Sequence, residues 1–335
     1  MTALSLAASP AAHHGLLTAD FGSYLEHSLH NPVTLDLSES SLLEVIDACS
    51  TVKSKFHPHF RENVRGLVFN LKQVENQYGV TLKPVQVTDI FYGYFIAFCE
   101  SRGLKTSSIK TMCCYLRSVL SWGAKYNATV SPTFTDFSIR RTYNHEIALT
   151  ADEVSRISYF DIDRFYAGRR RDFRETMHRV RDMFVLSCNL FQRHSDSVRI
   201  EPSCFDRNIF TITQQKTGAV AVVNIDRYSI DARTTYRILD QYNYHAPYKA
   251  GIGNYNWYLH EQMKDIGFTE PVRREECIRG NMVVSSVPKW KEITSHTARR
   301  TATTIAVMRG HNVNEIRRCT GHSDLSGLGR YIRDD

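Results

Sequence analysis

The chain has 335 residues and an ordinary globular composition, with 42% hydrophobic and 23% charged residues. This length is sufficient for two domains with separate cores. No run of about 18 apolar residues could cross a membrane, and the N-terminus lacks the basic segment of a signal peptide, so we expect a cytoplasmic protein without membrane contact. The net charge of +7 is compatible with a nucleic-acid partner but does not identify one.

The eight cysteines show neither the paired spacing of a zinc site nor that of a redox motif. We expect them to be reduced and mostly buried, because a free cysteine behaves as a small apolar side chain. The sequence also lacks a glycine-rich phosphate loop and a carboxylate cluster, so we expect no metal and no other cofactor.

The N-terminal part of the chain is expected to be helical after an irregular start. Residues 1–40 show no sustained helical period and are predicted to form a flexible N-terminal segment. From there apolar side chains recur every three or four positions, which predicts a helical domain over residues 41–142. Its four helices are expected to begin after Ser41, to span residues 59–78 and 87–102, and to begin again after Ser107.

The last two of these helices carry the side chains of most interest. In the third helix, the residues expected to face inward are Ile90, Tyr94, Phe95 and Phe98. Three cations lie on or near the fourth helix, and we expect this face to contact DNA: Lys105, Lys110 and Arg117.

A change of composition marks the boundary to a second domain, residues 143–335. Residues 127–144 contain Pro132 and are typical of an extended linker, to which Arg140 and Arg141 give a positive charge and a candidate role in DNA binding. A helix is expected to begin after Thr150, because this residue and Glu153 form a capping box.

A run of arginines follows between residues 164 and 181. Three of them, Arg169, Arg170 and Arg171, are candidates for contacts with DNA phosphates, which would make binding sensitive to salt. A charge run of this kind is equally typical of a solvated helix face.

The middle of the second domain alternates helices with a hairpin. Residues 183–191 are predicted to form an apolar helix. Two β-rich runs, residues 209–213 and 220–225, flank a turn with Lys216 at its tip, which predicts a hairpin. Helical stretches follow at about 229–243 and 254–266. The fold class expected is therefore mainly α, with an α+β second domain that holds a small antiparallel sheet.

The C-terminal segment holds a spaced set of polar side chains. His296 and Arg299 lie three positions apart, so both project from one face of the first turn of a helix. A further helix is expected to end at Gly321. His322 follows it directly, and Tyr331 lies nine residues after this histidine.

This set resembles the catalytic residues of the tyrosine recombinases, the family of phage and mobile-element integrases. The resemblance rests on an Arg-x-Ser-Asp motif at Arg193, a lysine on a hairpin tip, a His-x-x-Arg motif, a Gly-His motif and a tyrosine nine residues later. Each element is common, and each residue alone could be a helix cap, an exposed turn residue or a packing residue. The order and spacing of the whole set give the resemblance its specificity. Asp196 is expected to have a structural role near Arg193.

The resemblance implies a chemistry for each residue. Tyr331 would attack a DNA phosphate and form a 3′-phosphotyrosyl intermediate, while Arg193 and Arg299 stabilise the charge that develops on the phosphate. Lys216 would protonate the departing 5′ oxygen, and His322 would donate to the phosphate. His296 would either bind the phosphate or accept the tyrosine proton. Because the intermediate keeps the bond energy, rejoining requires neither ATP nor a metal.

The resemblance covers residues 41–335 and also implies an architecture. It predicts a SAM-like core-binding domain at 41–142 and a catalytic domain at 143–335, which together form a C-shaped clamp on DNA. The partners implied are a double-stranded recombination site and three further copies of the chain, as a tetramer on two DNA sites associated with the nucleoid. The function expected is integration or excision of a mobile element such as a phage.

Other functions remain open at this point. An Xer-like resolvase or a DNA invertase would use the same chemistry on a different arrangement of sites, and a relative of the type IB topoisomerases would reseal a single strand. A non-catalytic DNA-binding protein, or a helical scaffold without a DNA role, would need none of the six residues to act together.

Overall fold

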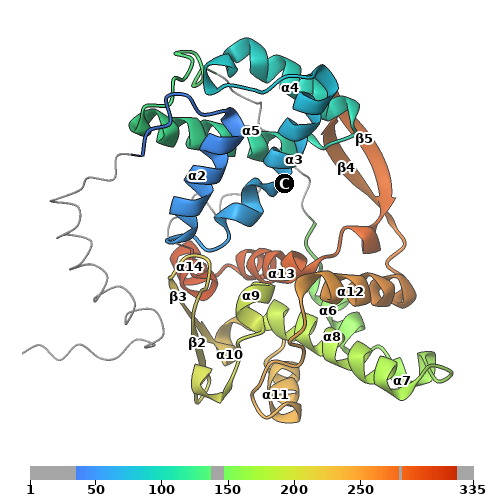
Figure 1. The fold of residues 1–335 in the computed structure, drawn as a ribbon. Coiled ribbons are helices and arrows are strands. Elements are labelled where there is room, and N and C mark those ends of the chain that lie inside the picture. Colours follow the sequence, from blue (N-terminus) through green and yellow to red (C-terminus); the bar gives the residue numbers. More distant parts are fainter. Residues whose placement is uncertain (1–34, 137–146, 279–280, 323–335) are drawn as a thin grey trace, which may run out of the picture. The chain divides into compact units, whose positions relative to one another are not determined.

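The computed structural model describes residues 35–136, 147–278 and 281–322. Contacts between Cα atoms divide the chain into unit 1, residues 1–142 with 276–282, and unit 2, residues 143–275 with 283–335 (Figure 1). Most of the predicted flexible segment, residues 1–34, lies outside the described residues. None of the described helices combines the length and the apolar character that a membrane span demands.

Unit 1 contains four main helices, which lie where the sequence predicts them. They are α2 (Leu42–Ser54), α3 (Phe60–Tyr78), α4 (Asp89–Ser101) and α5 (Thr106–Gly123), with short 3-10 helices at Pro84–Gln86 and Ala124–Tyr126 (Figure 1). The side chain of Ser41 caps α2 by accepting a hydrogen bond from the backbone nitrogen of Glu44. Gly79 ends α3 in the left-handed conformation.

The buried face of α4 differs from the prediction. Ile90 and Tyr94 are 66% and 75% exposed, so the expectation that they face inward is wrong. The buried residues of this helix are Tyr92, Phe95 and Cys99. Apolar residues lie on almost every side of α4, and their spacing therefore does not define a single inward face.

Unit 2 is built around the long helix α8 (Arg171–Leu190). The helices that pack against it are α6 (Ala151–Ser158), α11 (Ala232–Gln241), α12 (Ile252–Ile266) and α13 (Ser295–Met308) (Figure 1). Shorter helices are α7 (Ile162–Phe165), α9 (His194–Ser197), α10 (Ile225–Tyr228) and α14 (Val313–Thr320), with 3-10 helices at Pro202–Cys204 and Lys289–Lys291. The predicted capping box of Thr150 and Glu153 is confirmed at the start of α6.

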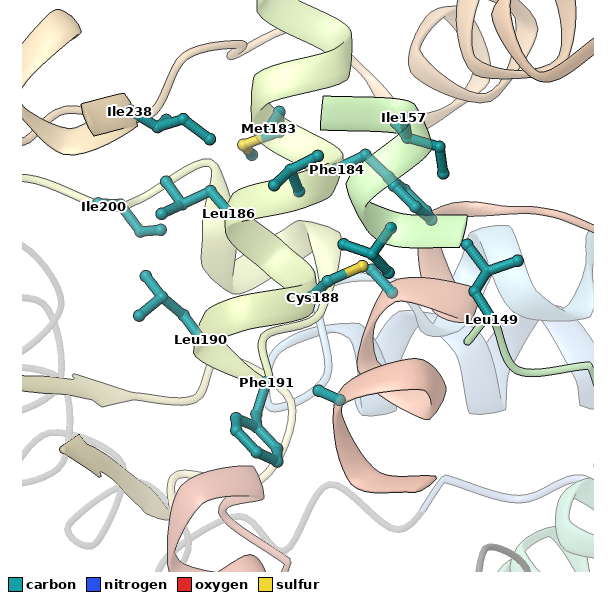
Figure 2. Close-up of a cluster of buried hydrophobic side chains, with 14 of the residues drawn as sticks. Leu149, Ile157, Met183, Phe184, Leu186, Cys188, Leu190, Phe191, Ile200 and Ile238 are labelled. Carbon is teal, nitrogen blue, oxygen red and sulfur yellow. The ribbon is translucent and has the colours of Figure 1, made fainter. Parts of the chain in front are cut away.

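The second half of α8 is the centre of the core of unit 2. All residues from Arg181 to Leu190 are buried, and Figure 2 shows Met183, Phe184, Leu186, Cys188 and Leu190 among apolar side chains of neighbouring elements. Burial of this apolar surface is the main favourable contribution to the stability of the unit.

One ion pair interrupts this apolar core. Nε of Arg181 donates to Oδ1 of the fully buried Asp182 at 2.9 Å, and the hydroxyl of Tyr242 donates to Oδ2 at 2.9 Å. Burial, reinforced by the Asp182 carboxylate, raises the pKa of Tyr242. The buried charges are therefore paired and hydrogen-bonded, as the low polarity of the core requires.

The described residues after 147 also form two small antiparallel sheets. The first has the strand order β1 (Phe205–Asp206), β2 (Ile209–Thr213) and β3 (Val220–Asn224), and β2 pairs with β3 so that Thr213 lies opposite Val220. This confirms the predicted hairpin. The second sheet consists of β4 (Pro271–Ile278) and β5 (Asn281–Pro288) and was not predicted from the sequence. The predicted class, mainly α with a small antiparallel sheet, is confirmed.

The cysteine side chains that the structure describes are all free thiols. The buried ones are Cys49, Cys99, Cys113, Cys188 and Cys319, whereas Cys204 is partly buried and Cys114 is exposed. The prediction of reduced and mostly buried cysteines is therefore confirmed for these side chains.

Candidate active site

Arg193 lies at a sharp turn between α8 and α9. Helix α8 ends at the buried residue Phe191, whose φ of 62° is left-handed and rare for a residue other than glycine. This turn makes Arg193 the residue that precedes α9. Arg193 is partly buried, and its Nη1 donates to Oε1 of Gln214 at 2.5 Å.

Lys216 lies at the exposed tip of the β2–β3 hairpin. The backbone nitrogen of Gln214 donates to the carbonyl of Ala219 at 2.9 Å, and the nitrogen of Gly218 donates to the carbonyl of Gln214 at 2.9 Å. Gly218 has a φ of 67°, which glycine adopts without strain. The hairpin therefore ends in a closed turn that carries a flexible ammonium group.

Asp196 fixes the base of this hairpin. Its buried carboxylate accepts a hydrogen bond from the backbone nitrogen of Gln215 at 2.8 Å and one from Nη2 of Arg199 at 3.2 Å. Arg199 also donates to the carbonyl of Thr213 at the end of β2. The structural role expected for Asp196 thus concerns the hairpin that carries Lys216, next to Arg193 in the chain.

Arg299 is the largest fully buried side chain among the described residues, with no exposed surface. It lies near the start of α13, three residues after His296. Its Nη1 donates to the carbonyl of Phe191 at 3.3 Å, which satisfies a carbonyl at the end of α8. Arg299 therefore joins the start of α13 to the same turn that presents Arg193.

His322 follows the left-handed Gly321 that ends α14 and contacts Arg299. Nδ1 of His322 lies 2.8 Å from Oγ1 of Thr320, whose hydroxyl donates to the carbonyl of Ile316 at 2.9 Å. Nη2 of Arg299 lies 3.3 Å from Nε2 and 3.4 Å from Nδ1 of the same ring.

The positive charges of the site act together on His296. The pKa of this histidine is lowered from 6.5 to about 4, first by burial and then by the charges of Arg300, Arg299, Arg193 and Lys216, in that order. These cations therefore lie close enough to His296 to disfavour its protonated form. At neutral pH the imidazole is uncharged and keeps a lone pair that can accept a proton.

Three predicted site residues lie outside the described residues. They are the candidate nucleophile Tyr331 and the linker arginines Arg140 and Arg141. The other five candidate catalytic residues belong to unit 2, where the interactions above connect them.

The cations predicted to contact DNA from unit 1 lie along α5. Lys105 immediately precedes this helix and is exposed, whereas Lys110 and Arg117 lie two turns apart on it and are partly buried. Arg117 is close to the buried hydroxyl of Tyr92, whose pKa burial raises to about 12 against the opposing effect of this arginine. Arg117 therefore also has a structural contact, and the DNA role of all three cations stays a prediction.

The arginines predicted to contact DNA from unit 2 lie at the start of α8. Arg170 pairs with Asp172 at 2.8 Å and Arg171 pairs with Glu175 at 2.7 Å, on the exposed surface, and Arg169 lies over the ring of Phe173. The 20 residues of α8 span about 30 Å, so this cluster and Arg193 lie at opposite ends of the helix. A role in DNA binding stays a prediction for these arginines too.

One residue of this site was missed in the sequence. Gln214 is buried, with 1% of its surface exposed, and its side chain accepts a hydrogen bond from Nη1 of Arg193 at 2.5 Å. The signal was available, because side chains of β2 alternate between the two faces and Phe210 and Ile212 face inward. Continuing that alternation by one step places Gln214 on the inward face as well.

No protein-family model and no curated protein sequence matches this chain. Solved structures do match it. A lambda integrase dimer bound to a COC' core site has a TM-score of 0.63 and 14% identity, over 88% of this chain and 96% of that chain. A lambda integrase tetramer bound to a Holliday junction also has a TM-score of 0.63 and 14% identity, over 95% of this chain and 86% of that chain.

The integrase of a transposon is similar in the same way. The Tn1549 transposon integrase in complex with a circular intermediate DNA has a TM-score of 0.61 and 13% identity, over 88% of this chain and 95% of that chain. Both integrases are tyrosine recombinases. The chain therefore has the fold of this class of enzymes. Because the sequence identity is only 13–14%, the similarity extends to the fold alone.

Proposed function

We propose that the protein is a site-specific tyrosine recombinase that integrates or excises a mobile element by cutting and rejoining double-stranded DNA. The observation that carries the proposal is the cluster of Arg193, Lys216, His296, Arg299 and His322. These side chains come from four separate segments of unit 2, with His296 and Arg299 both on α13, and the hydrogen bonds and electrostatic effects described above link them. The proposal is further supported by the fold, which is that of integrases whose structures contain DNA.

The chemistry that this cluster supports is phosphoryl transfer. Attack on a phosphodiester places additional negative charge on its non-bridging oxygens. Arg193 and Arg299 carry a permanent positive charge and offer forked donors that match these oxygens. Because Arg299 is buried and held by the carbonyl of Phe191, its guanidinium is oriented before the substrate binds.

In the proposed cleavage step, one bond to phosphorus replaces another. The phenol oxygen of Tyr331 forms a bond to phosphorus while the bond from phosphorus to the 5′ oxygen breaks. Lys216 donates a proton to the departing oxygen, and His296 accepts the proton of the tyrosine. A neutral imidazole is required for the second transfer, and the lowered pKa of His296 provides it. Rejoining is the reverse reaction, in which a 5′ hydroxyl of another strand attacks the phosphotyrosine.

A suicide substrate tests this function. The probe is a duplex recombination site nicked beside the crossover, so that the short fragment carrying the new 5′ hydroxyl diffuses away after cleavage and the covalent adduct accumulates. The wild-type protein should form a protein–DNA band that survives denaturation. Tyr331→Phe should bind the same DNA and form no band, because it lacks the attacking hydroxyl.

The alternative functions can be distinguished with the same protein and the same DNA probe. A non-catalytic DNA-binding protein would bind the probe without any adduct, and this result would overturn the proposal. An Xer-like resolvase or an invertase would form the adduct but would recombine two sites on one circle in preference to sites on separate molecules. We propose a tetramer on two DNA sites as the active form, since recombination of two duplexes requires four strand cleavages.

A further inference from the structure

Gln214 lies where three segments of the candidate site meet. It follows β2 directly, and the backbone of this residue closes the turn that carries Lys216. Its side chain does not point to solvent, and only 1% of its surface is exposed. A buried amide without hydrogen-bond partners is strongly destabilising, so the partners of Gln214 are informative about its role.

The partners fix the orientation of the Gln214 amide. Oε1 accepts from Nη1 of Arg193 at 2.5 Å, and Nε2 donates to the backbone carbonyl of Thr320 at 2.5 Å. A guanidinium can only donate and a carbonyl can only accept, so the opposite orientation of the amide would lose both bonds. The hydroxyl of Thr217, next to Lys216, adds a third contact to Oε1 at 3.3 Å.

Gly321 shows how closely the chain approaches this amide. A Cβ atom at Gly321 would lie 2.7 Å from Cδ and 2.9 Å from Nε2 of Gln214. The φ of 63° at this position also favours glycine. The turn between Thr320 and His322 is therefore packed directly against the Gln214 side chain.

We propose that Gln214 is a positioning residue that docks the Lys216 hairpin onto Arg193 and the Thr320–Gly321 turn. The inference rests on the proposed function, in which Lys216 is the general acid. It states that the Gln214 amide places this lysine. With Oε1 bound to one guanidinium nitrogen, Arg193 keeps its other donors for the phosphate. The same amide holds the tip of the hairpin at a set distance from that phosphate, where the 5′ oxygen departs.

Docking of the hairpin can be measured without DNA, because trypsin cleaves after Lys216. We expect Gln214→Met to be cut at this bond about tenfold faster than wild type, since the hairpin loses the two hydrogen bonds that hold it. Gln215→Met is the matched control: Gln215 is the neighbouring glutamine and is exposed. Its rate should remain within about twofold of wild type. Equal rates for the two variants would overturn the proposal.

The effect on the general acid can be measured with two suicide substrates. One carries the natural 5′ oxygen at the scissile phosphate, and the other carries a bridging 5′ sulfur, which leaves as a thiolate without being protonated. For Gln214→Met we expect adduct formation to fall about 100-fold on the oxygen substrate and less than about tenfold on the sulfur substrate. An equal loss on both substrates, or a loss on neither, would overturn the proposal.

Two further variants allow the same test if Gln214→Met does not fold. Gln214→Glu then replaces it, because a carboxylate still accepts from Arg193 but cannot donate to Thr320. Gly321→Ala displaces the amide from the other side and should produce the same substrate preference. If wild type forms no adduct on either substrate, the proposed function fails, while the trypsin comparison still decides whether Gln214 docks the hairpin.

Discussion

Acidification should destabilise the folded protein through His296 more than through an ordinary histidine. Burial, followed by the nearby arginine and lysine charges, lowers the pKa of this imidazole from 6.5 to about 4 in the folded chain. In the unfolded chain the pKa returns to its ordinary value. Between these two values the unfolded state binds a proton that the folded state excludes, so stability is complete above about pH 6.5 and falls as the pH drops toward 4.

The size of the effect follows from the two pKa values. At pH 5, the shift from 6.5 to about 4 corresponds to about 2 kcal/mol of lost folding free energy, and at pH 7.5 the loss is close to zero. His296→Asn removes the titrating group. The decrease in stability between pH 7.5 and pH 5 should therefore be about 2 kcal/mol larger in wild type than in this variant.

Urea unfolding at the two pH values measures this difference, with tryptophan fluorescence as the signal. A control comes from Arg300→Met, which removes the largest charge effect on His296 and should raise the pKa of that histidine. Histidine NMR signals followed against pH give the same pKa directly. Equal losses of stability in wild type and His296→Asn, or a His296 signal that titrates near pH 6.5, would refute the electrostatic description of the site.

Two other predictions concern the core and the cations that we propose contact DNA. Asp182→Ala should reduce the free energy of unfolding of unit 2 by about 3–5 kcal/mol, because it leaves Arg181 charged, buried and unpaired. Asp172→Ala, which removes an exposed pair, should cost less than about 1 kcal/mol, and urea titrations that show equal losses would contradict this difference. Lys110→Ala should reduce the slope of log affinity against log salt by about one in DNA-binding titrations. Arg170→Ala should change that slope less, since Asp172 already pairs with this arginine, and the reverse order would place the DNA on the start of α8.

Local signals in the sequence were sufficient for much of the fold and for the elements that carry the candidate site. The capping box at Thr150, the hairpin around Lys216 and the helix that carries His296 and Arg299 each depend on residues close together in the chain. Patterns of this kind are physically determined by neighbours at short range, so they can be read without tertiary information.

Features that depend on the tertiary environment could not be predicted as well. The face of α4 was wrong at Ile90 and Tyr94, because an apolar helix is oriented by its packing partners. Strand β4 was missed because four consecutive charged residues, 273–276, hide any alternation of apolar and polar side chains. The full burial of Arg299 also had no signal in the sequence, since arginine is usually exposed.

Some contacts in the candidate site join residues that are far apart in the chain, and the sequence motifs do not reveal them. One amide group, that of Gln214, joins Arg193 to Thr320. Thr320 lies more than 100 positions after both of the other residues in the chain. No spacing rule connects these residues, and only the folded chain brings them together.

Mapping the attachment point of the DNA tests the central claim most directly. The adduct formed on the suicide substrate is digested with nuclease and trypsin, and the peptides are analysed by mass spectrometry. The tryptic peptide that begins at Tyr331 should carry a nucleotide joined through its 3′ phosphate. A nucleotide on any other residue, or one joined through a 5′ phosphate, would contradict the proposal that Tyr331 is the nucleophile.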